Sequence, residues 1–396
     1  MKPLKIVAKK ITFIAILLVW KTTAFAQQQL LDSLKNNFDE YRSSCLVEKV
    51  YLHTDRESYL TGESVWFKAY VTDGSFHKPV DISKVLYVEL LNSSSLPVLQ
   101  TKISLENGKG NGSVYLPATI QSGNYVLRAY TNWMKNFSGD YFFQKAIAVV
   151  NTFKRVEVEN TVTTKKPDVQ FFPEGGNLVD GISATVAFRV VSSSGVGLVF
   201  QGALLNQQND TVVVFRPHKF GIGSFRFRPQ ADQQYTAVIT DDLGNVTTHP
   251  FVSVLDNGYT LQMMDSADRA SIHLSASGKD DVIFLFIHAR NSIAFAQYQM
   301  LVNGKAEVVI PEEVWYDGVN HITVFNHELK PVCERLYFKM PKKTMQLKVA
   351  TDNHQYVTRR RVKAEIVATA TQSANVSVSV YRTDSLYDQK NHLLHY

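Results

Sequence analysis

The chain has 396 residues, of which 45% are hydrophobic and 11% aromatic, so it is long enough to bury several cores. Its formal net charge is +6, but residues 1–26 hold five lysines and no acidic residue, and the remainder has 37 basic against 36 acidic residues. This near-neutral balance argues against a nucleic-acid partner and against binding driven by an acidic membrane surface.

The first 26 residues have the layout of a secretory signal peptide. Lysines up to Lys10 precede an apolar run over residues 11–20, and Ala24 and Ala26 form an A-x-A cleavage site before Gln27. The run is shorter than the roughly 20 residues that span a bilayer; an uncleaved anchor is the alternative. Because the residue after the site is not cysteine, lipoprotein anchoring is not indicated. We predict an exported protein, in the periplasm or associated with the outer membrane at the cell surface, without a membrane-spanning segment in the mature chain.

Residues 27–45 are predicted to form a short amphipathic helix and a linker. Leu30, Leu34, Phe38 and Tyr41 recur at helical spacing within residues 29–42. Such a stripe usually packs on protein, and membrane anchoring is the alternative.

From Lys49 onward the hydrophobic pattern has a period of two. In residues 65–71 the odd positions are all apolar, and the even positions carry Trp66 and Tyr70. Strict alternation is typical of antiparallel sandwiches, and no long helical pattern separates the strands as parallel β-α-β architecture requires. We expect Trp66 and Tyr70 to be at least half buried, because aromatic residues on an outer face usually mark a neighbouring element.

Two internal repeats indicate how the chain is organised. A strand–turn–strand unit in residues 50–71 recurs in residues 352–366, which means that the same supersecondary unit was built twice. A Gly-x-Gly-Ser strand that is stopped by proline recurs in residues 110–117 and 221–229, and more loosely near residues 308–325. The pairs in the first repeat, all 297 positions apart, are Asp55 and Asp352, Tyr59 and Tyr356, and Val65 and Val362.

Polar joints at residues 164–167, 256–258 and 341–343 separate units of sandwich size. The predicted fold is all-β: tandem immunoglobulin-like antiparallel β-sandwiches after a signal peptide and a short helix. The predicted segments are a signal peptide (1–26), helix and linker (27–45), three sandwiches (46–160, 168–256 and 257–341) and an incomplete fourth sandwich (344–396). The fourth has the repeated entry unit and one further strand, residues 376–381. We expect its missing strands to come from a continuation of the gene product or from another chain, and we expect it to be weakly protected from hydrogen exchange.

The repeated unit resembles the entry strands of a macroglobulin-like domain in relatives of alpha-2-macroglobulin. Residues 123–131, 171–176 and 334–336 are similar to a set of exported bacterial proteins that often continue into a TonB-dependent-receptor plug-like domain. The resemblance implies macroglobulin-like sandwiches, an envelope location and an endopeptidase-inhibitor or scaffold role. The residues that match the family pattern are Thr54, Asp55, Arg56, Tyr59, Gly62, Glu63, Val65 and Phe67.

The chain departs from the protease-trapping members of that family. They use a Gly-Cys-Gly-Glu-Gln thioester, whereas Cys45 is followed by Leu-Val-Glu-Lys and Cys333 by Glu-Arg. The two cysteines lie in different predicted domains, which favours separate thiols over a disulfide. We predict a non-enzymatic envelope binding or scaffold module with an unidentified envelope protein as partner. The alternative is an accessory region of a TonB-dependent outer-membrane uptake system.

No catalytic, cofactor-binding or metal-binding residue is predicted. His53 and Asp55 share a strand face without a third ligand nearby, and a surface polar pair is favoured over a metal pair. His327 and Glu328 lack the second histidine of a zincin. The remaining candidates are turns: a glycine run at residues 108–112 instead of a phosphate loop, residues 241–245 instead of a calcium loop, and basic residues 359–361 with Lys363 instead of an anion patch.

Overall fold

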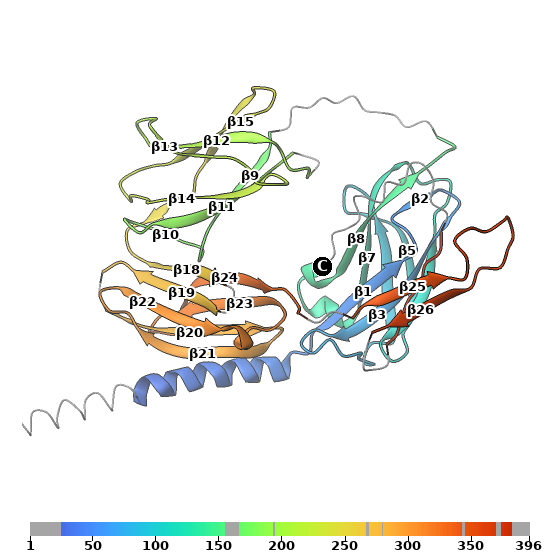
Figure 1. The fold of residues 1–396 in the computed structure, drawn as a ribbon, viewed down its shortest axis with the longest axis horizontal. Coiled ribbons are helices and arrows are strands. Elements are labelled where there is room, and N and C mark those ends of the chain that lie inside the picture. Colours follow the sequence, from blue (N-terminus) through green and yellow to red (C-terminus); the bar gives the residue numbers. More distant parts are fainter. Residues whose placement is uncertain are drawn as a thin grey trace, which may run out of the picture. The chain divides into compact units, whose positions relative to one another are not determined.

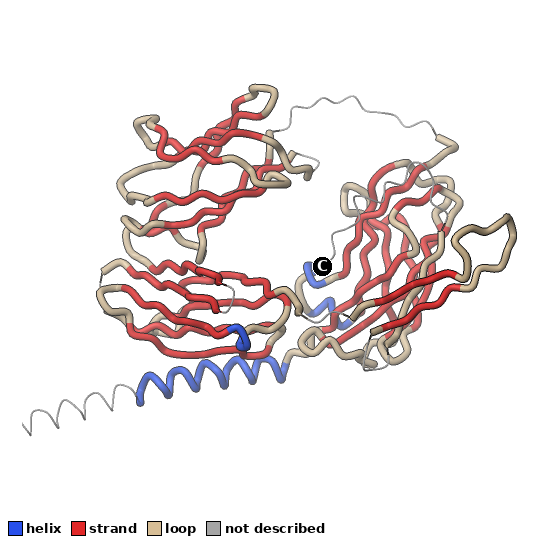
Figure 2. Tube along the Cα trace, viewed as in Figure 1, coloured by secondary structure: helices blue, strands red, loops and turns tan. Residues whose placement is uncertain are grey.

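The computed structural model describes residues 25–154, 166–192, 195–266, 269–278, 280–342, 345–369 and 374–381. These residues are mostly strands, with one helix over residues 25–44 (Figure 1, Figure 2). The predicted all-β class with a short N-terminal helix is confirmed. The chain divides into two compact units, one of Cys45–Asn160 with Lys343–Tyr396, the other of Met1–Ser44 with Thr161–Lys342. The predicted signal peptide lies almost wholly outside the described residues.

In the first unit, two sheets pack face to face, in the orders β1-β3-β6 and β2-β8-β7-β4-β5. All neighbouring strands are antiparallel except β2 and β8. The elements are β1 Glu48–Thr54, β2 Ser58–Leu60, β3 Ser64–Asp73, β4 Val85–Leu91, β5 Pro97–Ser104, β6 Lys109–Tyr115, β7 Gly123–Thr131, η1 Trp133–Asn136, η2 Gly139–Tyr141 and β8 Phe143–Val150.

The alternation in β3 separates its two faces as predicted. Val65, Phe67, Ala69 and Val71 are buried in the core. The expectation for Trp66 was wrong, because 60% of its surface is exposed, whereas the expectation for Tyr70 is confirmed, because more than half of its surface is buried. Nothing among the described residues covers the indole enough to bury it, although a chain segment lies beside it.

The same unit contains a hairpin of β25 (Leu347–Thr351) and β26 (Ala364–Ala368). Its register pairs Thr351 with Ala364, and β1 pairs Thr54 with Phe67, 297 positions earlier in each strand. All residues of β25 are exposed, whereas Val50 and Leu52 of β1 are buried. The repeat thus preserves strand pairing but not the covering of its apolar face.

In the second unit, the next sandwich has sheets in the orders β14-β11-β9 and β13-β12-β15-β16, with a parallel pair β10-β17. Its core is rich in phenylalanine. The strands are β9 Asp168–Pro173, β10 Leu178–Val179, β11 Ala184–Val191, β12 Phe200–Leu205, β13 Thr211–Phe215, β14 Ile222–Phe227, β15 Thr236–Asp241, β16 Val246–Pro250 and β17 Val254–Leu255.

The Gly-x-Gly-Ser repeat has a packing cause. Gly112 on β6 pairs across the sheet with Phe67 on β3, and Gly223 on β14 pairs with Phe188 on β11. A Cβ atom on Gly223 would lie 2.5 Å from the Phe188 ring, and one on Gly112 would lie 3.1 Å from the Phe67 ring. Each glycine therefore leaves room for a core phenylalanine on the neighbouring strand.

The third sandwich has sheets in the orders β18-β19-β22 and β21-β20-β23-β24. Its core lies between them. The elements are β18 Tyr259–Ser266, β19 Arg269–Ala276, β20 Val282–Ala289, β21 Ser292–Met300, β22 Lys305–Pro311, η3 Glu312–Val314, β23 Gly318–Phe325 and β24 Pro331–Lys339.

The helix lies along the outer face of β20 and β21 (Figure 1). The Phe38 ring is 5.1 Å from the Phe286 ring, centroid to centroid. The buried stripe differs from the prediction, since Leu31 is buried whereas Leu30 and Tyr41 are exposed. β20 is therefore covered on both faces, which explains its unbroken apolar run.

Candidate functional site

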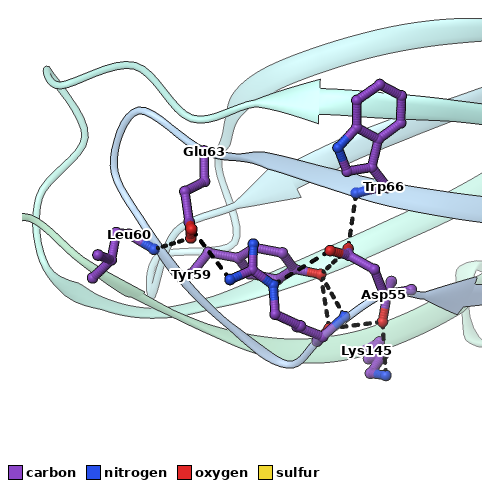
Figure 3. Close-up of polar contacts among 8 residues, drawn as sticks. Asp55, Tyr59, Leu60, Glu63, Trp66 and Lys145 are labelled. Carbon is purple, nitrogen blue, oxygen red and sulfur yellow. Dashed lines mark hydrogen bonds and ion pairs between the residues drawn. The ribbon is translucent and has the colours of Figure 1, made fainter. Parts of the chain in front are cut away.

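The family-like motif of the first sandwich forms a hydrogen-bonded turn (Figure 3). The Tyr59 hydroxyl donates to Asp55 Oδ1 at 2.8 Å, and the Trp66 N–H donates to the same oxygen at 2.9 Å. The Arg56 N–H donates back to the Tyr59 hydroxyl at 3.1 Å. Tyr59 is almost fully buried; this burial, with the Asp55 carboxylate, raises the pKa of its hydroxyl well above the ordinary value.

A second layer of contacts closes the turn. Arg56 Nη1 lies 3.2 Å from Glu63 Oε1, and its guanidinium stands 4.9 Å from the centre of the Tyr59 ring. The other Glu63 oxygen accepts from the Leu60 N–H at 2.8 Å. Gly62 has a φ of 91°, which favours glycine. The motif thus organises the turn between β1 and β3.

The C-terminal repeat reproduces the inner part of this network. The Tyr356 hydroxyl donates to Asp352 Oδ1 at 2.5 Å. The Lys363 N–H donates to that oxygen at 3.0 Å, as Trp66 does to Asp55. The outer ion pair has no counterpart, because Asn353 and Arg360 stand where Arg56 and Glu63 would. The two turns that resemble each other in sequence, those of Asp55 and Asp352, therefore make the same inner hydrogen bonds.

A shallow groove of about 290 Å³ lies beside this turn, between the outer face of β3 and residues 376–379. Trp66 and Lys68 line it, and His53 Nδ1 lies 2.5 Å from Ser377 Oγ. Burial, together with nearby Lys145, lowers the pKa of His53. His53 and Asp55 both line this groove, and their side chains have different hydrogen-bond partners.

Two sequence motifs meet at the junction of the second and third sandwiches. Glu174, in the loop after β9, lies 2.6 Å from Arg335 Nη1 on β24. Glu174 Oε1 also accepts from the Met263 N–H at 2.9 Å. The neighbouring Asn177 donates to the Val332 carbonyl at 2.9 Å. These contacts join residues from both sandwiches, and we call them the Glu174 brace.

Glycine allows the close approach at this brace. Gly175 has a φ of 81°, and a Cβ atom there would lie 2.9 Å from the Leu261 backbone nitrogen. Cys333 lies in the same region and donates to the Tyr259 carbonyl at 3.2 Å. Burial raises the pKa of its thiol to about 12. The sequence motifs at residues 171–176 and 334–336 signalled these positions, but not that they touch.

The remaining candidates from the sequence lie at turns and loops between strands. His327 Nδ1 lies 3.1 Å from Asp281 Oδ1 at the edge of the third sandwich. Asp241 accepts from the Asn245 N–H at 2.7 Å in the turn between β15 and β16. Residues 359–361 are exposed between β25 and β26. In the described ranges, no three histidine, cysteine, aspartate or glutamate side chains converge to hold a metal ion.

A polar pocket of about 390 Å³ opens on the third sandwich. It brings together Asp265, Arg269, Glu312 and Lys339 beside Tyr337. The Tyr337 hydroxyl donates to Asp265 at 3.1 Å, and the Lys339 ammonium donates to the Trp315 carbonyl at 3.0 Å. The Glu312 carboxylate pairs instead with Lys342, which does not line the pocket. Sequence reasoning did not identify this pocket, because its residues come from four separate elements.

Comparison with known proteins gives fold-level likeness only. No protein-family model matches the chain, and no curated protein matches it. Among solved structures, Escherichia coli alpha-2-macroglobulin activated by porcine elastase is 12% identical with a TM-score of 0.28, over 82% of this chain and 33% of that one. The BSP domain of a biofilm-associated protein is 10% identical with a TM-score of 0.25, over 75% and 67%.

A tetra-tandem repeat from the extending region of a large adhesion protein is also similar, with 10% identity and a TM-score of 0.21, over 83% of this chain and 89% of that one. The chain spans about a third of the length of the first alpha-2-macroglobulin structure. At these TM-scores the likenesses carry no conclusion about function. Among the described residues, no helix combines the length and apolar character that crossing a bilayer requires.

Proposed function

We propose that this chain is a non-enzymatic, exported β-sandwich array of the macroglobulin-like kind, which binds and spaces envelope proteins. The Glu174 brace is the observation that supports this role most directly. A spacer must keep its modules at a constant orientation, and relative motion is the default for sandwiches joined by a small interface. An ion pair at 2.6 Å, with side-chain exposures of 30% and 13%, restrains that motion.

The outer face of the first sandwich supports the binding part of the proposal. Tyr51, Trp66 and Tyr115 project from β1, β3 and β6, and each has more than half of its surface exposed. Aromatic residues are enriched at protein interfaces because they bury a large area with little loss of conformational freedom. We propose that a folded envelope protein docks on this face. Covalent protease trapping is not proposed, since neither cysteine lies in a thioester motif.

Site-specific photocrosslinking in intact cells tests this function. A benzophenone amino acid replaces Trp66 in one variant and Leu243, an exposed residue in the turn after β15, in the control variant. We expect a defined crosslinked envelope protein from position 66 and none from position 243. Equal labelling at both positions, or recovery of the chain only in the cytoplasm, contradicts the proposal. Capture of a TonB-dependent receptor at position 66 would favour the uptake-system alternative.

A further inference from the structure

The helix covers an aromatic strip on the outer face of β20 in the third sandwich. Alternate residues of β20 face away from the sandwich core, and among them Phe284 and Phe286 are almost completely buried. Phe286 also contacts Phe325 on β23, with 6.3 Å between ring centroids. Phe38 is the helix residue whose ring lies against this strip. The strip would be exposed to water if the helix left it, which costs free energy in proportion to the apolar area.

A histidine lies at the end of this strip, under the helix. The His288 ring is 5.0 Å from the Phe38 ring, and its Nδ1 atom is buried with no hydrogen-bond partner. The His321 ring stacks on it at 4.8 Å with an angle of 7° between planes. Neither aromatic contact supplies an acceptor for a second ring N–H. A proton on His288 would therefore be poorly solvated while Phe38 remains in place.

The charged groups around His288 act in opposite directions on its pKa: His321 lowers it, and Glu334 raises it by less. On β24, Glu334 lies 3.3 Å from His321 Nδ1. The stacked His321 ring opposes a positive charge on His288. The helix contributes the partly buried cations Lys35 and Arg42, and Arg42 pairs with Asp39 at 3.3 Å. β21 contributes Tyr298 as its only titratable side chain.

We propose that the helix over residues 25–44 is a pH-sensitive cover, docked on β20 while His288 is neutral and weakened when His288 takes up a proton. Undocking moves Phe38 away and gives the imidazolium access to water. It also exposes the aromatic strip to other partners. This inference concerns the third sandwich and does not depend on the proposed partner of the first one.

The expected size of the effect follows from proton linkage. Burial first, and then the charge of His321, lower the pKa of His288 from 6.5 to about 4 in the docked state. A group whose pKa is depressed on docking favours docking above its free value, and this contribution is lost as the pH falls from 6.5 towards 4. The docking constant should therefore fall about 30-fold between pH 7.5 and pH 5.

Hydrogen exchange measured by mass spectrometry on the whole protein tests this. A free helix of this length is marginally stable in water, so undocking exposes its amides. After correction for intrinsic exchange rates, we expect protection factors for residues 30–42 to fall about 30-fold at pH 5. His288→Phe removes the titration and keeps an aromatic ring, and His288→Gln is a second neutral variant. Both should keep their protection at pH 5.

Two further variants separate this mechanism from general acid loosening. Phe38→Ala should lower helix protection at both pH values and reduce its pH dependence. His273→Gln, on β19 in the opposite sheet, should behave like the unmodified protein. The proposal is wrong if protection in the unmodified protein changes less than threefold, or if both His288 variants lose protection at pH 5 as the unmodified protein does.

Discussion

Glu174 and Arg335 belong to different sandwiches, yet their charged groups meet at 2.6 Å. Glu174 Oε1 also accepts a backbone N–H from β18, so one carboxylate holds both the loop after β9 and two strands of the next sandwich. Glu174 lies in residues 171–176 and Arg335 in residues 334–336, two segments that resemble a set of exported bacterial proteins. The contact gives these two motifs a common structural role at the junction.

Removing one partner of the brace should destabilise the junction. Because the pair is partly buried, we expect Glu174→Ala or Arg335→Ala to lower the free energy of unfolding by about 1–3 kcal/mol. A double-mutant cycle by urea denaturation measures the coupling. The exposed pair Glu328 and Lys330 is the control, with an expected effect below about 0.5 kcal/mol. Additive effects of the two brace substitutions would show that the contact contributes no coupling.

Tyr59→Phe and Tyr356→Phe form a matched pair of tests. Removing the Tyr59 hydroxyl leaves the Arg56 N–H without its acceptor in an almost buried turn, so a loss of about 1–3 kcal/mol is expected. Tyr356 is more exposed, and water can replace its hydroxyl, so we expect a loss below about 1 kcal/mol. Chemical denaturation followed by tryptophan fluorescence compares them. Equal losses of unfolding free energy in the two variants would mean that burial does not determine how much this hydrogen bond contributes to stability.

Gly223→Ala should destabilise the second sandwich. The new methyl group would meet the Phe188 ring at 2.5 Å, and overpacking of this kind costs about 1–3 kcal/mol. Gly139→Ala is the control, because Gly139 is exposed and has open space around its Cβ position. Thermal unfolding of both variants measures whether Gly223→Ala is less stable than the control. A Gly223→Ala protein as stable as the control would show that the glycine repeat has no packing cause.

The two cysteines should differ in reactivity. Both are thiols; Cys333 is buried with a pKa of about 12, whereas Cys45 is partly exposed. At pH 8 we expect a disulfide reagent to label one thiol quickly in the native protein and the second only after unfolding. Cys45→Ser should abolish the fast phase. Rapid labelling of Cys333 in that variant would indicate that the junction opens readily.

The amino-acid sequence by itself determined the features that depend on neighbouring positions. Alternation of apolar residues set the strands and the core face of β3, because successive side chains of a strand point to opposite sides. The offset of 297 located the Asp352 turn because its hydrogen bonds link residues within about a dozen positions. The helix was also predictable, although its buried stripe includes Leu31 where the prediction had Leu30 and Tyr41.

Only the tertiary structure decided which faces meet. Phe38 and His288 are brought together by the packing of a helix on a strand far along the chain, and no local period encodes that choice. The same holds for Glu174 and Arg335. Trp66 is the opposite case. The strand pattern places its side chain on the outer face, but that pattern cannot specify whether another element will cover it. A side chain is buried only when residues from several elements, often distant in the sequence, pack around it. The pattern of one segment specifies the surface of that segment and not the surfaces that pack against it.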